Sequence, residues 1–346
     1  MVYGAIDLHA RSSEIRIIDA EGRVVRHRRV KTTREQVVHA FDGQGPMRIL
    51  VEASTESEWV AQALEAVGHE LVVADPNYGP MYGTLRRCVK TDRRDTEALC
   101  EANRRGWYRP VHRVSPEQRT MRQRLAIRRQ LVRMRSSLIA QLRAVLRQDG
   151  RRLSSGSSTT VPTRVDRMAL PAPLQAVIAP LVAALRALSP LIAAETRRLE
   201  RVADADALLL RLQTVPGVGP IVALSYRAAL DDVQRFRTAA QASSCVGLVP
   251  REDSSAERRV RGHITKVGSS EARAMLIQAA WTCWRHRHGR STPLRSWADA
   301  LAARRGVRIA VVGLARRLSR ILFALWRDGS TFRTPAAAAA GTGAIA

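Results

Sequence analysis

Short apolar runs separated by polar turns fill the first 75 residues, a pattern typical of the strands of a sheet. Five strands are predicted, at residues 2–9, 14–20, 23–31, 47–54 and 70–76. Two helices are predicted between the later strands, at residues 32–41 and 57–67. Because three hairpin-like strands come first and helix and strand alternate afterwards, we expect a single mixed sheet.

In the middle of the chain the apolar positions recur every three or four residues, which predicts a long amphipathic helix over residues 115–149. Ser115 suits its N-cap, and Gly150 stands where a glycine would end it. Nine arginines lie along this helix.

A second periodic run covers residues 174–199, where Pro180 and Pro190 are expected to kink or interrupt the helix. A Ser-rich linker at 153–164 joins the two runs. The pair predicts either an antiparallel helical hairpin or an intermolecular coiled coil.

Three folded regions and a tail follow from these patterns. We expect an α/β domain at 1–113, the helical hairpin at 114–203, a mostly helical domain at 204–334 and a disordered tail at 335–346. The fold class is therefore α/β plus all-α, and the order of strands and helices in the first domain is that of the ribonuclease H-like fold.

Arginine dominates the charge of the chain. Lys and Arg number 57 against 31 Asp and Glu, a formal net charge of +26. A surplus of this size repels itself unless a polyanion is bound, so nucleic acid is the expected partner. On the long helix, Arg128, Arg129 and Arg133 are candidates for holding DNA or RNA.

An anionic membrane is the alternative partner for so basic a protein. The sequence shows no lipidation motif, no secretory signal and no apolar stretch that we judge long enough to span a bilayer. We therefore expect no membrane partner and a cytoplasmic, nucleoid-associated location in a bacterium.

Four carboxylates stand at positions that favour a metal site. Asp7 and Glu52 lie within two apolar strands, and Asp92 and Asp95 are three apart at the start of a predicted helix. Convergent carboxylates repel each other unless a divalent cation is present, and oxygen ligands suit Mg²⁺. Two ions about 4 Å apart would clamp the oxygens of a phosphodiester. Alternatively, each acid is an edge residue or part of a solvated helix face.

The segment Pro-Gly-Val-Gly-Pro at 216–220 lies between two helical runs and is typical of a helix-hairpin-helix motif. Gly217 and Gly219 would let backbone N–H groups approach a phosphate at the start of the next helix. The alternative is a tight turn that serves only packing.

A polar, basic loop follows further along the chain. It contains Ser254 and Ser255 among cations, namely Arg251, Arg258, Arg259, Arg261 and Lys266. A serine hydroxyl attacks a phosphate only when it is activated and surrounded by positive charge, which these residues could supply. The alternative is a pair of serines that contact phosphate or solvent.

These motifs together resemble the DEDD-type insertion-sequence transposases of the IS110 family, which are bridge-RNA-guided serine recombinases. The resemblance covers residues 3–334. Asp7 and Glu52 match the family's strand acids, and Lys90 opens a Lys-Thr-Asp-x-x-Asp motif that supplies Asp92 and Asp95. The C-terminal matches are at residues 216–219, 247–256 and 264–268.

The resemblance implies a nucleophilic serine at Ser255, although Ala256 stands where the family has glycine and leaves Ser254 open as an alternative. It further implies that Ser255 forms a phosphoserine link to DNA, with two Mg²⁺ ions held by the four acids. Donor and target DNA would be selected by a structured guide RNA. The site would be assembled between protomers of a dimer or tetramer.

Other classes remain open from the residues alone. A resolvase-like nuclease would use the four carboxylates without a serine, and a nucleic-acid-binding remnant of a mobile element would use neither. An actin-like ATPase shares the Ile-Asp-Leu strand but needs Gly-rich phosphate loops, which do not follow the strands of this sequence.

Overall fold

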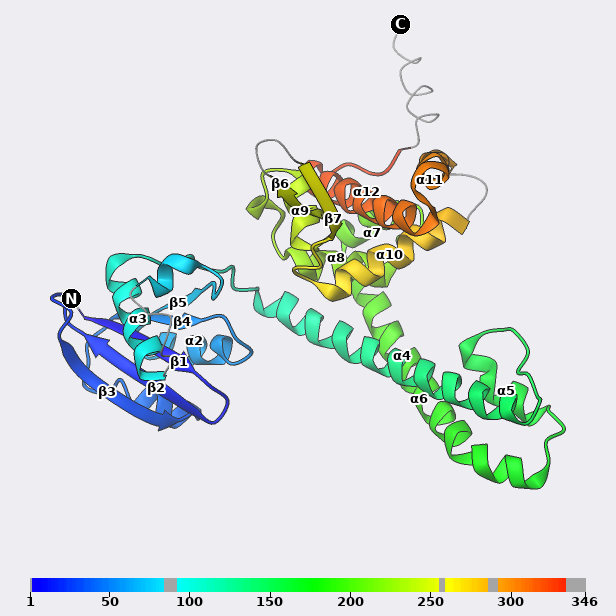
Figure 1. The fold of residues 1–346 in the computed structure, drawn as a ribbon, viewed down its shortest axis with the longest axis horizontal. Helices are drawn as coiled ribbons and strands as arrows, with labels where there is room; N and C mark the ends of the chain where they lie inside the picture. Colours follow the sequence, from blue (N-terminus) through cyan, green and yellow to red (C-terminus); the bar gives the residue numbers. More distant parts are fainter. Residues whose placement is uncertain (1, 84–91, 255–258, 286–291, 334–346) are drawn as a thin grey trace, which may run out of the picture. The chain divides into compact units, whose positions relative to one another are not determined.

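The computed structural model describes residues 2–83, 92–254, 259–285 and 292–333. Its contacts divide the chain into two compact units, Met1–Arg113 and Val114–Ala346 (Figure 1). The division of the second unit into a hairpin, a helical domain and a tail stays a prediction.

The first unit is built on a five-stranded mixed sheet. Its strands are β1 Tyr3–Leu8, β2 Ser12–Ile18, β3 Val24–Lys31, β4 Arg48–Glu52 and β5 Glu70–Ala74, in the order β3-β2-β1-β4-β5. β1 pairs antiparallel with β2, which pairs antiparallel with β3, whereas β4 pairs parallel with both β1 and β5. The five strands and the mixed sheet predicted from the sequence are confirmed.

Helices cover both faces of this sheet because its central strands, β1 and β4, bury consecutive residues that point to opposite faces. α1 Arg34–His39 and α2 Ser57–Glu65 bury one face through a cluster that includes Ile6, Ile15 and Leu64. α3 Asp92–Arg105 buries the other face through Leu99 and Ala102, together with η1 Gly79–Tyr82. The side chains that share the α3 face with Asp7 are therefore those at alternate positions of each strand.

The second unit begins with a helical hairpin. α4 Pro116–Gln148 is capped by Ser115, whose hydroxyl accepts a hydrogen bond from the Gln118 amide, and it ends before Gly150, which takes φ +70°. α6 Ala172–Asp204 packs antiparallel to α4: Leu142 lies in one cluster with Ile178, near the tip, and Leu125 lies in another with Leu199. The two helices therefore pack against each other within one chain.

Two details of the hairpin differ from the prediction. α6 is one continuous helix through Pro180 and Pro190, so the predicted interruption is wrong, and the predicted kink stays a prediction. A buried face that includes Ile178, Val182 and Leu185 holds the helix against α4. This packing offsets the cost of about 3 kcal/mol for each interior proline.

The Ser-rich segment is not wholly a linker. It contains η2 Ser158–Thr160 and the start of α5 Val161–Asp166. Val161 and Val165, one turn apart, bury their side chains in the hairpin core and so order this segment.

α6 also corrects the expectation that no stretch is apolar enough to cross a membrane. By length and composition this helix passes that test, since Arg186 is the single charged residue between its start and Glu195. The core helix of a soluble protein passes the same test, but such a helix is mostly buried, whereas 22% of the apolar window of α6 is buried within this chain.

The rest of the second unit is mostly helical, as predicted. Its helices are α7 Ala207–Leu212, α8 Pro220–Leu230, η3 Val233–Arg235, α9 Ala239–Cys245, α10 Ser270–Arg285, α11 Thr292–Arg305 and α12 Val307–Asp328. α8 and α12 lie at the centre of the core, where the buried Tyr226 hydroxyl donates to the Ser319 carbonyl at 2.7 Å. In the part of the predicted polar loop that the structure describes, β6 Pro250–Ser254 and β7 Arg259–Ile264 pair antiparallel, so this part is a ribbon of two strands.

Candidate metal centre and nucleic-acid contacts

Asp7 is the next-to-last residue of β1 and lies on the sheet face that α3 covers. The parallel register pairs Ile6 with Val51, so Asp7 and Glu52 occupy the next positions on neighbouring strands and share a face. Glu14 on β2 pairs directly with Asp7 and also lies on this face. Its Oε1 lies 2.6 Å from Nε2 of His27. Glu14 is an acid that the sequence reasoning missed, because its position follows only from strand register.

The first turn of α3 brings two further acids to this face. Asp92 and Asp95 are one turn apart, at the helix end where the backbone dipole favours negative charge. Asp95 is buried and Asp92 is half-exposed. Both contribute to the raised pKa of Asp7, whose main cause is burial of that carboxyl, while His9 opposes the increase. The structure thus brings Asp7, Asp92 and Asp95 into electrostatic contact.

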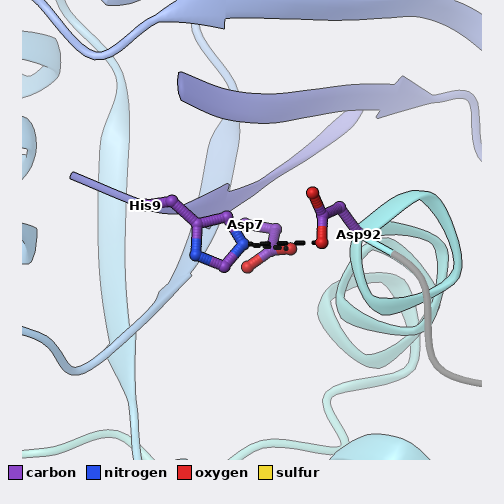
Figure 2. A group of neighbouring side chains, drawn as sticks. All are labelled: Asp7, His9 and Asp92. Carbon is purple, nitrogen blue, oxygen red and sulfur yellow. Dashed lines mark ion pairs between the residues drawn. The ribbon is translucent and has the colours of Figure 1, made fainter. Parts of the chain in front are cut away.

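His9 joins the carboxylates, as Figure 2 shows. Its Nε2 lies 3.3 Å from Oδ2 of Asp7 and 3.7 Å from Oδ1 of Asp92. A guanidinium nitrogen of Arg29 on β3 lies 4.0 Å from Oδ2 of the same Asp92. Sequence reasoning missed His9, although its position two residues after Asp7 was a usable signal.

The residues present fit a divalent cation. Ligand atoms of Asp7, His9 and Asp92 all lie within 4.8 Å of one another. Oδ2 of Asp7 is buried, and Nε2 of His9 lies 3.3 Å from it. Burial of the Asp7 carboxyl and its repulsion with Asp92 and Asp95 favour metal binding by these groups.

The three candidate arginines of α4 have different environments. Nε of Arg128 donates to the Thr196 hydroxyl of α6 at 2.8 Å, and the guanidinium of Arg129 pairs with Glu271 of α10 at 2.9 Å. Burial raises the pKa of Glu271, an effect that Arg129 opposes. Arg133 is exposed. Two of the three arginines therefore have structural partners within the unit.

The two glycines of the Pro-Gly-Val-Gly-Pro turn also differ. Gly217 takes φ +83°, and a Cβ there would lie 2.4 Å from the carbonyl oxygen of Ala279 on α10. Gly217 therefore serves close packing, which is the alternative that the sequence left open. Gly219 is the N-cap residue of α8, and a Cβ there would meet nothing within 4 Å.

Of the two candidate serines, the structure describes Ser254, the last residue of β6. In the backbone register of the ribbon, Ser254 stands opposite Arg259 of β7, and Glu252 stands opposite Arg261. Arg251 is exposed on β6. Ser255, Arg258 and Lys90 lie outside the described residues.

The base of the ribbon is tightly packed. Gly268 approaches the backbone of Cys245 so closely that a Cβ would overlap its carbonyl, and Gly247 meets Val267 in the same way. Lys266 takes φ +57° between them, donates its amide to the Gly247 carbonyl and exposes its side chain. This packing fixes where the ribbon leaves the helical core.

Comparisons with known proteins agree with this architecture. A model described as the transposase IS116/IS110/IS902 family matches residues 209–294, and a DEDD transposase model of IS110 elements matches residues 5–149. The first of these matches covers the turn before α8 and the ribbon, and the second covers the sheet and α3.

Curated relatives match over nearly the whole chain. A probable family 20 transposase of Pseudomonas aeruginosa is 30% identical over 334 residues, which are 95% of this chain and 97% of that protein. The transposase for insertion sequence element IS1111A of Coxiella burnetii is 30% identical over 321 residues, 91% and 87% of the two chains. The transposase for element IS1328 of Yersinia enterocolitica is 25% identical over 338 residues, 94% and 97%.

These matches define the class of enzyme as a DNA transposase. The chain belongs to the IS110 family of insertion-sequence transposases. The resemblance predicted from its motifs is thereby confirmed.

Proposed function

We propose that this transposase cuts and rejoins DNA through a phosphoserine intermediate, with Mg²⁺ held by Asp7, Glu52, Asp92 and Asp95 on a ribonuclease H-like sheet. The observation that carries the proposal is the convergence of Asp7 and the first turn of α3 on one sheet face, where burial and the neighbouring Asp95 and Asp92 raise the pKa of Asp7. Bound metal would supply Lewis-acid stabilisation of the charge that develops on the phosphodiester.

The chain's own residues have separate tasks in this scheme. The hydroxyl oxygen of Ser255 attacks phosphorus, its proton passes to solvent, and the bond from phosphorus to the 3′-oxygen breaks. The departing 3′-oxygen takes a proton, and the DNA 5′-phosphate stays on serine until a 3′-hydroxyl of the other DNA strand attacks in reverse. Exposed cations of the ribbon, such as Arg251, neutralise the phosphate.

Donor and target DNA would be selected by a structured guide RNA, at the bacterial nucleoid. The net charge of +26 supports binding of more than one nucleic acid strand. Base pairing would then choose the sequence while the protein holds the backbones.

The α4–α6 hairpin would bring protomers together as a dimer or tetramer. Five large apolar side chains of this hairpin are exposed in the single chain, namely Ile127, Met134, Val177, Leu191 and Val202. Apolar side chains gathered on one element favour association through that element.

Metal-dependent strand cleavage tests the carboxylate site. Purified full-length protein is mixed with Mg²⁺, a DNA duplex that carries the element's end and RNA transcribed from the flanking non-coding segment. Asp7→Asn should abolish cleavage but keep DNA binding, whereas Asp42→Asn, an exposed control, should cleave normally. Cleavage by Asp7→Asn at the wild-type rate would overturn the proposed site.

A further inference from the structure

His9 occupies the position that a third ligand would take beside Asp7 and Asp92. Its Nε2 lies 3.3 Å from one carboxylate oxygen and 3.7 Å from the other (Figure 2). Two neighbouring ligand atoms around an octahedral ion with bonds of about 2.1 Å are about 3 Å apart. Small movements of these side chains would therefore bring all three atoms onto one ion.

The backbone that carries His9 is held firmly. His9 opens the short connection between β1 and β2, and its carbonyl accepts a hydrogen bond from the Thr32 hydroxyl at 2.7 Å. The amide of Thr32 donates to the Arg11 carbonyl at 3.1 Å, and the Thr32 and Ser13 hydroxyls lie 2.7 Å apart. The turn thus directs the imidazole toward the carboxylates, while half of that side chain remains exposed and free to adjust.

An imidazole changes which metal a carboxylate site prefers. Mg²⁺ favours oxygen ligands and loses its water reluctantly, whereas first-row transition ions accept nitrogen readily. A site made of carboxylates alone would discriminate little between Mg²⁺ and a transition ion such as Mn²⁺. One nitrogen ligand makes the site favour the transition ion. A neutral imidazole also binds a cation without adding charge to the crowded acids.

We propose that His9 is a direct ligand of a metal ion held with Asp7 and Asp92, and that its nitrogen makes this site prefer Mn²⁺ over Mg²⁺. The inference rests on the proposed metal centre but goes beyond its four carboxylates. The competing explanation is that His9 forms only an ion pair with the two acids, which metal binding would displace.

Pulsed electron paramagnetic resonance of Mn²⁺ bound to the full-length protein distinguishes these explanations. A coordinated imidazole produces a nitrogen modulation of the Mn²⁺ echo. We expect this modulation in the wild type and in His39→Ala, a control whose histidine pairs with Asp42 away from the cluster. We expect it to disappear in His9→Ala and His9→Gln. Its absence from the wild type, or its persistence in His9→Ala, would overturn the inference.

Titration of the two ions gives an independent measurement. His9→Ala should weaken Mn²⁺ binding by about tenfold or more, since loss of even an outer partner of a ligand costs about that much. Mg²⁺ affinity, measured by competition, should change much less, so the Mn²⁺ to Mg²⁺ preference should fall. An unchanged preference would contradict the inference.

Asp7→Asn separates failure of this inference from failure of the metal centre. If Asp7→Asn binds Mn²⁺ as tightly as the wild type, the proposed centre itself is wrong. If Asp7→Asn loses Mn²⁺ but the wild type shows no nitrogen modulation, the centre stands and His9 is not a ligand. Circular dichroism should show that each variant is folded.

Discussion

The side-chain amide of Asn103 donates a hydrogen bond to the backbone carbonyl of Gly4 at 2.8 Å, and this bond ties α3 to the strand that carries Asp7. The same amide reaches the Arg48 carbonyl of β4 at 2.8 Å, and the Asn103 side-chain oxygen accepts from the Arg48 guanidinium at 2.9 Å. Asp92 and Asp95 lie at the other end of α3, so Asn103 helps set where that helix places them.

Replacement of Asn103 should therefore affect both stability and metal binding. Asn103→Ala leaves two strand carbonyls and Arg48 without this partner, which should lower the free energy of unfolding by about 1–3 kcal/mol. Mn²⁺ affinity should also fall, because α3 is less firmly positioned. Asn77→Ala, at an exposed asparagine of the same unit, is the control. Urea denaturation with equal stability of the two variants would contradict this role.

The two glycines before α8 should respond differently to alanine. Gly217→Ala combines a left-handed backbone with overlap of the Ala279 carbonyl, which should cost about 2–4 kcal/mol. Gly219→Ala has open space around its Cβ and no left-handed φ, so its denaturation midpoint should stay close to that of the wild type. Equal midpoints for both variants would show that the packing of Gly217 on α10 is unimportant.

The arginines of α4 should separate into structural and binding groups. Arg133→Ala should weaken nucleic acid binding and reduce its salt slope by about one unit. Its loss of stability should be smaller than that of Arg129→Ala, because Arg133 acts on Glu271 less strongly than Arg129 does. Arg129→Ala leaves the half-buried Glu271 without its partner and should lower stability by about 1–3 kcal/mol. If Arg133→Ala binds DNA and RNA like the wild type at every salt concentration, α4 does not hold them through this residue.

Asp7 should destabilise the metal-free protein at neutral pH. Its pKa in the folded state is raised above the ordinary 3.8, so the folded state binds a proton more readily than the unfolded state. Stability should therefore rise as the pH falls from neutral toward the ordinary pKa. In EDTA, Asp7→Asn should increase the free energy of unfolding at pH 7 and flatten this pH dependence. A destabilised Asp7→Asn protein in EDTA would contradict the role assigned to burial.

Strands and long helices could be predicted because their apolar periodicity is a local signal. The strand that carries Asp7 is a short apolar run that pairs with β2 and β4. After Ser115, apolar residues recur every three or four positions along one face of α4. Packing between distant segments gave no such signal. Val161 and Val165 order a Ser-rich segment because they pack against apolar side chains of α4 and α6. The residues near them in the sequence do not indicate this packing.

The candidate site was predicted in part for the same reason. Asp7, Glu52 and the acids of α3 could be named because each lies in a recognisable strand or helix. The place of Glu14 depends on strand register. The position of His9 two residues after Asp7 was a local signal, but its orientation toward the acids depends on the hydrogen bond from the Thr32 hydroxyl, 23 residues away. The packing of Gly217 depends on the approach of α10. Such contacts are set by tertiary structure and carry no periodicity that a sequence displays.

Covalent attachment of the protein to DNA tests the central claim most directly. Wild type, Ser254→Ala and Ser255→Ala are incubated with Mg²⁺, labelled duplex that carries the element's end and RNA from the flanking segment, and then separated on a denaturing gel. The wild type and Ser254→Ala should show a labelled protein–DNA adduct, and Ser255→Ala should show none, because no other group replaces the lost hydroxyl. An adduct formed by Ser255→Ala, or cleavage by the wild type without any adduct, would contradict the account and favour a metal-dependent nuclease that uses water.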